Sequence, residues 1–204
     1  MPTDYELLDA WAAGDRSAGN ELFDRYFPSV FGFFRSKVGD KAEDLAQQTF
    51  LNITKSIDGF RRESSFRSYL FSVARNRLYN YLKREQAQVF DGGVTSCADL
   101  GLSPSMEFAK SEEHALLLRA LRALPLDFQV ALELFYFEQM RGPELAAALD
   151  LPEGTVRSRI RRGRDALRDK LEELSASREL LESTMTNLEQ WAEQVRDAAL
   201  GDAD

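Results

Sequence analysis

The sequence is poor in cysteine and histidine. Among its 204 residues there is one cysteine, Cys97, and one histidine, His114. One cysteine excludes a disulfide within the chain, and the two residues together are too few for an ordinary Cys/His zinc site. The same scarcity argues against a Ser/His or Cys/His nucleophilic centre. We therefore expect no metal and no cofactor, a linker thiol at Cys97 and a helix-surface imidazole at His114.

Long apolar runs are also missing. No stretch of about 18 apolar residues is present for a membrane span. The first residues, "MPTDYELLDA", lack the basic, apolar and small-residue order of a secretion signal. We expect a chain without membrane insertion that works in the cytoplasm.

Positive charge is scarce overall but concentrated in two places. The net charge is −8, yet residues 61–84 carry +6 and residues 141–170 carry +3. Two basic islands in an acidic background predict two sites for a polyanion, while the surrounding acids suppress indiscriminate binding. Both sites could contact one long ligand.

Apolar residues recur at helical spacing almost everywhere, and no stretch alternates long enough to indicate a sheet. The chain is predicted to be all-α, with two small helical domains joined by a flexible linker. We assign residues 1–85 to the first domain, and 86–110, which are rich in Gly, Ser and Asp, to the linker. The second domain spans 111–174, and an acidic helical extension spans 175–204.

The second domain has the pattern of a helix-turn-helix. A short helix, "GPELAAALD", is followed by a turn and the long basic helix "PEGTVRSRIRRGRDALRDKLEEL". Val156, Ile160, Leu167 and Leu171 share one face of that helix, which leaves the arginines free to meet a DNA groove. Near its N-terminal end, Thr155, Arg157, Ser158 and Arg159 are the candidates for base or phosphate contacts.

The first basic island differs, because it mixes arginines with aromatic rings in "FRRESSFRSYLFSVARNRLYNYLKRE". Cations suit the backbone of nucleic acid, and flat rings suit unstacked bases, so this mixture favours opened DNA as well as duplex. For any single ring, such as Phe71 or Tyr81, a place in the core is the simpler interpretation.

Three segments together resemble conserved regions 2 and 4 of the extracytoplasmic-function (group IV) sigma factors of bacterial RNA polymerase. They are "EDLAQQTF", "FRSYLFSVARNRLYNYLKRE" and "LPLDFQVALELFYFEQMRGPELAAALDLPEGTVRSRIRRGRDALRDKL". The resemblance covers roughly residues 14–174, and it is the occurrence of both regions in this order that makes it specific.

The resemblance implies an alternative, non-enzymatic sigma factor that binds core RNA polymerase, directs it to promoters and assists DNA opening. Its partners would be the β′ clamp and β flap of the polymerase, duplex and opened promoter DNA, and an anti-sigma factor or other regulator. Residues implied to bind core polymerase are Asp44, Leu45, Gln47, Gln48 and Phe50. Residues implied to bind the −10 element are Arg61, Arg62, Ser64, Arg67, Arg75, Arg77, Asn80, Lys83 and Arg84. Residues implied to bind the −35 element are Thr155, Arg157, Ser158, Arg159, Arg161 and Arg162.

Three positions depart from the family pattern. Tyr69 stands where tryptophan is usual, Asn80 where aspartate is common, and Gln48 where glutamate is common. We expect only the lost acid at Gln48 to matter, by weakening docking on the polymerase.

Beyond Leu174 the family requires nothing, yet a heptad-like apolar seam continues through Leu181 and Leu188. This tail could extend the preceding helix, or fold back as a separate helix starting near Thr186. One hypothesis is a regulatory tail whose seam packs on either domain or on a partner. The alternative is a solvated, partly frayed acidic helix.

Two other functions remain open at the level of sequence. A helix-turn-helix regulator could bind duplex DNA as a dimer without polymerase, but it leaves "EDLAQQTF" and the aromatic basic island unexplained. An enzyme acting on nucleic acid could bind Mg²⁺ through Glu43 and Asp44, although a helix dipole and a docking role suffice for these carboxylates.

Overall fold

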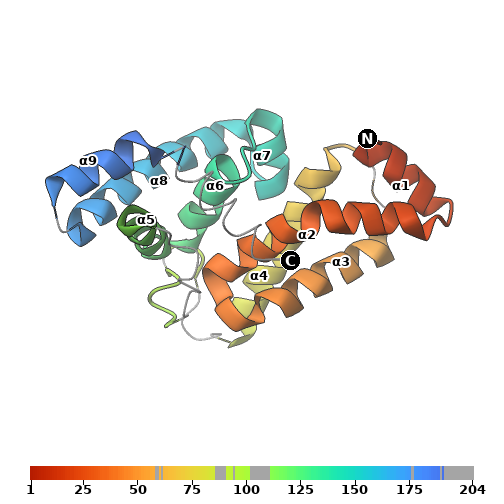
Figure 1. Ribbon diagram of the computed structural model, residues 1–204, viewed down its shortest axis with the longest axis horizontal. Coiled ribbons are helices and arrows are strands. Elements are labelled where there is room, and N and C mark those ends of the chain that lie inside the picture. Colours follow the sequence, from red (N-terminus) through yellow and green to blue (C-terminus); the bar gives the residue numbers. More distant parts are fainter. Residues whose placement is uncertain are drawn as a thin grey trace.

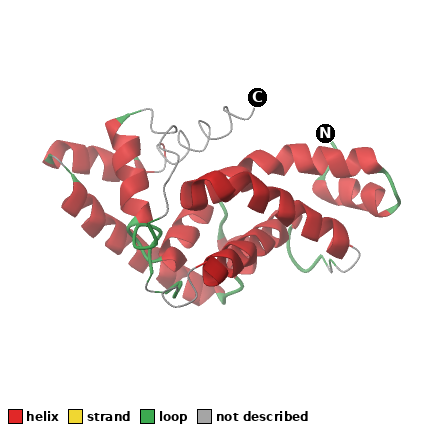
Figure 2. Cartoon of the chain, turned by 90° about the horizontal axis from the view of Figure 1, so that it is seen from below, coloured by secondary structure: helices red, strands yellow, loops and turns green. Residues whose placement is uncertain are grey.

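The computed structural model describes residues 1–57, 60, 62–85, 91–93, 95–101, 111–175, 177–188 and 190. Within these residues every named element is a helix, as predicted (Figure 2). None of the described helices has both the length and the apolar composition to cross a membrane. The elements are α1 (Asp4–Ala12), α2 (Arg16–Val38), the short 3₁₀ helix η1 (Gly39–Lys41), α3 (Ala42–Ser56), α4 (Phe66–Glu85), α5 (Glu112–Arg122), α6 (Leu126–Tyr136), α7 (Gly142–Leu149), α8 (Glu153–Leu174) and α9 (Arg178–Thr186).

Helices α1 to α4 form the first helical group. Thr3 and Glu6 form a capping box that starts α1, and the Asp15 side chain caps α2 by accepting from the Ser17 amide. Helix α2 packs on α1 and α3, and α3 packs in turn on α4. The buried aromatic and aliphatic side chains of this group include Leu22, Phe34, Ile53, Phe66, Leu70, Phe71 and Leu78.

Helices α5 to α9 form the second group. Helix α7 ends at Asp150, whose left-handed backbone (φ 53°) reverses the chain into α8 and completes the predicted helix-turn-helix. Helix α8 packs on α5, α6 and α7. Gly163 permits the close approach to α6, because a Cβ there would lie 3.3 Å from Leu132 Cγ.

The two groups are not separate in space. In Figure 1, α1 to α4 lie on one side and α5 to α9 on the other, and α4 packs extensively on α7. A buried ion pair also joins them, because Lys37 of α2 bonds to Glu133 of α6, with side-chain exposures of 0% and 4%.

Two expectations about single residues were wrong. Cys97, expected to be a thiol on a linker, is fully buried beside α5, where the Ala98 amide donates to the Arg122 carbonyl at 3.1 Å. His114, expected on a helix surface, is only 4% exposed. Helix α5 contacts α2, α6, α8 and α9, so it has little free face. The linker boundaries themselves remain a prediction.

The C-terminal extension folds back as a separate helix, but not from Thr186. Helix α8 ends at Leu174, and α9 begins at Arg178 with the Ser177 side chain as its cap. Helix α9 contacts α5 and α8, and Leu188 beyond it is buried. The described part of the seam therefore packs on the second group of helices.

Candidate polymerase and nucleic-acid interface

The "EDLAQQTF" motif lies on α3 and divides into a buried and an exposed part. Leu45 and Phe50 are buried, and the Phe50 ring lies 4.8 Å from the Phe23 ring, centroid to centroid. Asp44 and Gln47 are exposed. The two apolar members thus hold α3 in the core, and the polar members are available to a partner.

Sequence reasoning missed Leu51, which follows the motif directly. Its side chain is 58% exposed, one of few large apolar side chains left in water among the described residues. On a helix, Leu51 lies one turn after Gln47 and Gln48 and so extends their stripe. The apolar Leu51 directly after the buried Phe50 was the available signal, because it lies on the same helix face as the polar residues Gln47 and Gln48.

A groove of about 420 Å³ runs between α3 and α4. Gln48 spans it, because its Nε2 donates to Asp44 Oδ2 at 2.8 Å and its Oε1 accepts from Arg77 Nη1 at 3.0 Å. The predicted polymerase-binding and −10-binding residues are therefore joined by hydrogen bonds across this groove.

The segment before α4 is tied to α1. Arg62 has a left-handed backbone (φ 56°), its guanidinium pairs with Asp9, and it lies 5.6 Å from the Tyr5 ring. The Tyr5 hydroxyl donates to the Ser64 carbonyl at 3.2 Å. Arg61, also predicted to bind the −10 element, lies outside the described residues.

Along α4 the predicted DNA-binding residues differ in availability. Arg67 Nη2 donates to Glu138 Oε2 of the second group at 3.0 Å, and Arg77 is held by Gln48. Asn80, Lys83 and Arg84 are exposed. The open cations of α4 therefore lie at its C-terminal end.

The aromatic side chains of this region also divide. Phe66 and Phe71 are buried, as the simpler interpretation of a single ring expects. Tyr69 and Phe60 are half-buried and stacked, with centroids 4.8 Å apart, and Tyr69 forms a hydroxyl contact of 2.7 Å with Ser56. This stacked pair stands at the start of α4, where it offers a flat partly open surface.

Helix α8 presents most of its predicted contact residues to solvent. Thr155, Arg157, Arg161 and Arg162 are exposed, and Ser158 is half-buried with its hydroxyl donating to the Thr155 carbonyl at 2.8 Å. Arg157 has one exposed partner, Glu153, at 3.6 Å. An exposed ion pair of this kind contributes little free energy, so a DNA phosphate can readily replace Glu153 as the partner of Arg157.

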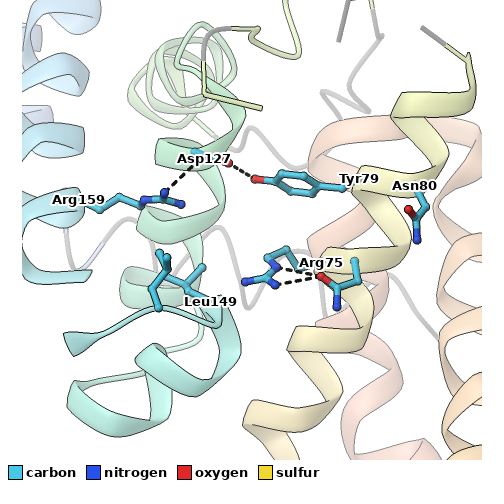
Figure 3. A pocket seen from close by; sticks show the side chains of 8 residues that line it. Arg75, Tyr79, Asn80, Asp127, Leu149 and Arg159 are labelled. Atoms are coloured by element: carbon cyan, nitrogen blue, oxygen red, sulfur yellow. Dashed lines mark hydrogen bonds and ion pairs between the residues drawn. The ribbon is translucent and has the colours of Figure 1, made fainter. Parts of the chain in front are cut away.

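Arg159 points the other way, toward the junction of the two groups. Figure 3 shows its guanidinium directed at Asp127, 3.1 Å away, while the Tyr79 hydroxyl reaches the same carboxylate from α4. A pocket of about 390 Å³ lies between them and is also lined by Arg75.

Burial changes the protonation chemistry around this pocket. It raises the pKa of the Tyr79 phenol, and the hydrogen bond to Asp127 adds to the rise. Burial also lowers the pKa of the Arg75 guanidinium, which bonds to Asn76 Oδ1 at 2.9 Å. Both effects have the same physical cause, since a low-dielectric site disfavours the charged form. In the part of the chain described here, no group of three or more acidic, histidine or cysteine side chains is placed to hold a metal ion.

Comparison with known proteins gives two family matches in this order along the chain. Residues 22–88 match the model of sigma-70 region 2, and residues 114–167 match the model of sigma-70 region 4. The first match contains α3 and α4, and the second contains α7 and most of α8.

Curated relatives and solved structures agree with these matches. The ECF RNA polymerase sigma-E factor of Haemophilus influenzae is 32% identical over 185 residues, covering 84% of this chain and 97% of the relative. The protein of the same name from Escherichia coli K12 is 30% identical over 186 residues, covering 84% and 96%.

Among solved structures, CnrH in complex with the cytosolic domain of CnrY has a TM-score of 0.63 and 25% identity, covering 84% of this chain and 99% of CnrH. The sigma factor RpoE in complex with the anti-sigma factor NepR from Bartonella quintana has a TM-score of 0.59 and 25% identity, covering 75% and 96%. This chain therefore belongs to the sigma-70 family, and within it to the extracytoplasmic-function group.

Proposed function

We propose that this protein binds core RNA polymerase, directs it to specific promoters and assists DNA opening, as an alternative sigma factor. The observation that carries this function is the presence of sigma-70 regions 2 and 4, in order, in one chain. Each region holds one of the two basic islands, so one chain supplies cations for two separated promoter elements. The protein itself carries out no chemical step, and it works in the bacterial cytoplasm with the polymerase and the chromosome.

Core polymerase binds the outer stripe of α3 in this proposal. Asp44, Gln47 and Gln48 supply polar contacts, and the exposed Leu51 supplies an apolar anchor in their midst. Leu45 and Phe50 are buried and do not belong to the exposed stripe, but they hold α3 in position in the core. A small apolar anchor surrounded by polar contacts is the usual composition of an energetically important interface patch.

The −10 element binds α4 and the segment before it. Asn80, Lys83 and Arg84 form the open part of this surface, and the stacked Phe60 and Tyr69 rings provide a surface for unstacked bases. Arg62, Arg67, Arg75 and Arg77 join this surface when their partners are exchanged for phosphates. The proposal also assigns Arg61 and Ser64 to it.

The −35 element binds α8 as duplex. A helix fits the major groove, and arginines near its N-terminal end can pair with guanine edges. Arg157, Arg161 and Arg162 are exposed on this helix, and Thr155 and Ser158 lie on its first turns. Arg159 contributes once it leaves Asp127.

A protein regulator is a further partner. The two similar structures contain CnrY or the anti-sigma factor NepR. By this likeness we infer that an anti-sigma factor binds the present chain and competes with core polymerase.

Run-off transcription tests the proposal. Purified bacterial core polymerase is assayed over a promoter library with and without the protein, and we expect transcripts only when it is present. The Leu51→Asp variant should lose transcription and core binding, because a charge replaces the apolar anchor. The Asn20→Asp variant adds the same charge at an exposed position of α2, outside the stripe, and serves as the control. Absence of both transcripts and core binding with the unaltered protein would contradict the proposal and favour a duplex-binding regulator.

A further inference from the structure

The basic face of α4 is covered by the second group of helices, and the contacts are specific. Ser68 is fully buried, and its hydroxyl donates to the Glu144 carbonyl at 3.0 Å. Ser65 reaches the carboxylate of the same residue at 3.2 Å. Glu144 lies in the first turn of α7, so the start of α4 and the start of the helix-turn-helix are bonded directly.

The cations in this contact are matched by carboxylates. Arg67 bonds to both the carbonyl and the carboxylate of Glu138, and its other guanidinium nitrogen lies 4.0 Å from Glu144. The Glu138 side chain is only 9% exposed. Farther along α4, Tyr79 bonds to Asp127, which also holds Arg159 of α8 (Figure 3).

A fully buried ion pair lies deeper in the same junction. Lys37 Nζ contacts the Glu133 carboxylate, whose other oxygen accepts from Gln129 Nε2 at 2.8 Å. Ser36 also donates to this carboxylate at 3.1 Å, and Arg122 donates to the Ser36 carbonyl. A buried pair is tolerated only while both charges stay matched, so loss of one partner strongly disfavours the buried arrangement.

These contacts involve residues that the proposed function assigns to DNA. Arg67 belongs to the −10 set and is held by carboxylates of the second group, whereas Arg159 of the −35 set is held by Asp127 within its own group. A carboxylate and a phosphate compete for the same guanidinium donors. The closed chain therefore cannot offer Arg67 to a promoter.

We infer that the second domain is a ligand of the first: Glu138 and Glu144 hold Arg67 of α4 in place of DNA phosphates, Glu133 pairs with Lys37 of α2, and together these carboxylates hold the free chain closed. The claim that closure withholds promoter-binding residues rests on the proposed function, whereas the closed state itself does not depend on that function. Only open molecules then bind DNA through this face. The measured affinity for DNA is therefore the affinity of the open state multiplied by the fraction of molecules that are open.

The test compares two charge-matched variants. Glu133→Gln, Glu138→Gln and Glu144→Gln together remove the carboxylates of the junction with isosteric amides. Asp165→Asn, Asp169→Asn and Glu172→Gln together change the charge equally at exposed positions of α8, away from the junction. Circular dichroism and thermal unfolding establish that each variant is folded, and the first triple is repeated without Glu133→Gln if it is not.

Two quantities are measured on the free full-length proteins. Small-angle X-ray scattering gives the radius of gyration, and fluorescence anisotropy gives affinity for a fluorescein-labelled, mixed-sequence 20-nucleotide single strand. We expect the junction variant to have a larger radius than the unaltered protein and the charge control. For a chain that is closed nine times in ten, opening should raise affinity about tenfold over the control.

Equal radii for the two variants, or a larger radius with no gain in affinity over the charge control, would overturn the inference. The run-off assay separates this from the proposed function. An expanded, tighter-binding junction variant that supports no transcription with any promoter would count against the sigma function alone, because neither readout uses polymerase.

Discussion

The two basic helices differ in how their charges are used. Along α4, Arg67 and Arg77 are held by Glu138 and Gln48, and only the C-terminal end is open. Along α8, Arg157, Arg161 and Arg162 are exposed. A similar density of arginine in the sequence thus produces one surface that is largely engaged and one that is largely free. Charge content alone does not tell whether a basic helix is ready to bind.

The largest expected effect comes from the free helix. Arg157→Ala with Arg161→Ala should weaken binding of the polymerase complex to a responding promoter at least about thirtyfold, because each specific arginine contact contributes about 1–3 kcal/mol. Arg164→Ala with Arg168→Ala removes two exposed arginines farther along the same helix and should have a much smaller effect. Equal losses in the two double variants, measured by electrophoretic mobility shift, would contradict a reading role for the N-terminal part of α8.

The junction between the two regions has its own probe in Cys97. Burial raises the pKa of this thiol to about 11, despite the opposing charges of Lys37 and Arg122. At pH 8 its thiolate fraction should be about a hundredfold below that of an ordinary thiol, and only the thiolate reacts. We expect iodoacetamide to modify Cys97 about tenfold more slowly in the folded protein than in guanidinium chloride if one molecule in ten is open, and more slowly still if fewer are open.

Modification should accelerate as the pH rises toward 11. Equal rates for folded and unfolded protein at pH 8 would show that the junction is open in solution. The reaction is followed by mass spectrometry, which resolves the single added group.

The open end of α4 provides the next test. Lys83→Ala with Arg84→Ala should weaken binding of the opened non-template strand about tenfold and lower the salt dependence of that binding by roughly two phosphate contacts. Titrations of a fluorescent single strand with the polymerase complex at several salt concentrations measure both. An unchanged salt slope would mean that these two cations face solvent in the complex.

The smallest expected effect concerns Gln48, which joins the two predicted surfaces of the first domain. Gln48→Glu restores the acid common in the family and strengthens the bond to Arg77 by adding charge. We expect core affinity to rise about threefold, the scale of a surface ion pair. Asn52→Asp on the same helix is the charge control, and surface plasmon resonance with immobilised core polymerase that detects no difference would refute the idea.

Much of the fold was available in the sequence, because the helices have clear apolar periodicity. The all-α class, the helix-turn-helix and the inward positions of Phe34, Phe66 and Leu70 follow from spacing alone. The family resemblance added the candidate site residues, and the structure shows which of those on α8 are exposed to solvent.

The rest depended on tertiary contacts that spacing does not encode. Lys37 and Glu133 are separated by 96 residues and look like ordinary surface charges until the two groups of helices meet. Cys97 and His114 were misplaced for the same reason, since their burial comes from contacts with helices that are distant in the sequence. Leu51 was missed because the motif ended one residue before it.

Footprinting on a responding promoter tests the central claim most directly, that two basic helices of one chain contact two promoter elements within a polymerase complex. With core polymerase present, we predict two separated protected segments, with permanganate-reactive thymines at the downstream one. The Arg157→Ala, Arg161→Ala variant should lose the upstream segment first. A single symmetric footprint that forms without polymerase, and no reactive thymines when polymerase is added, would contradict the account and identify a duplex-binding dimer instead.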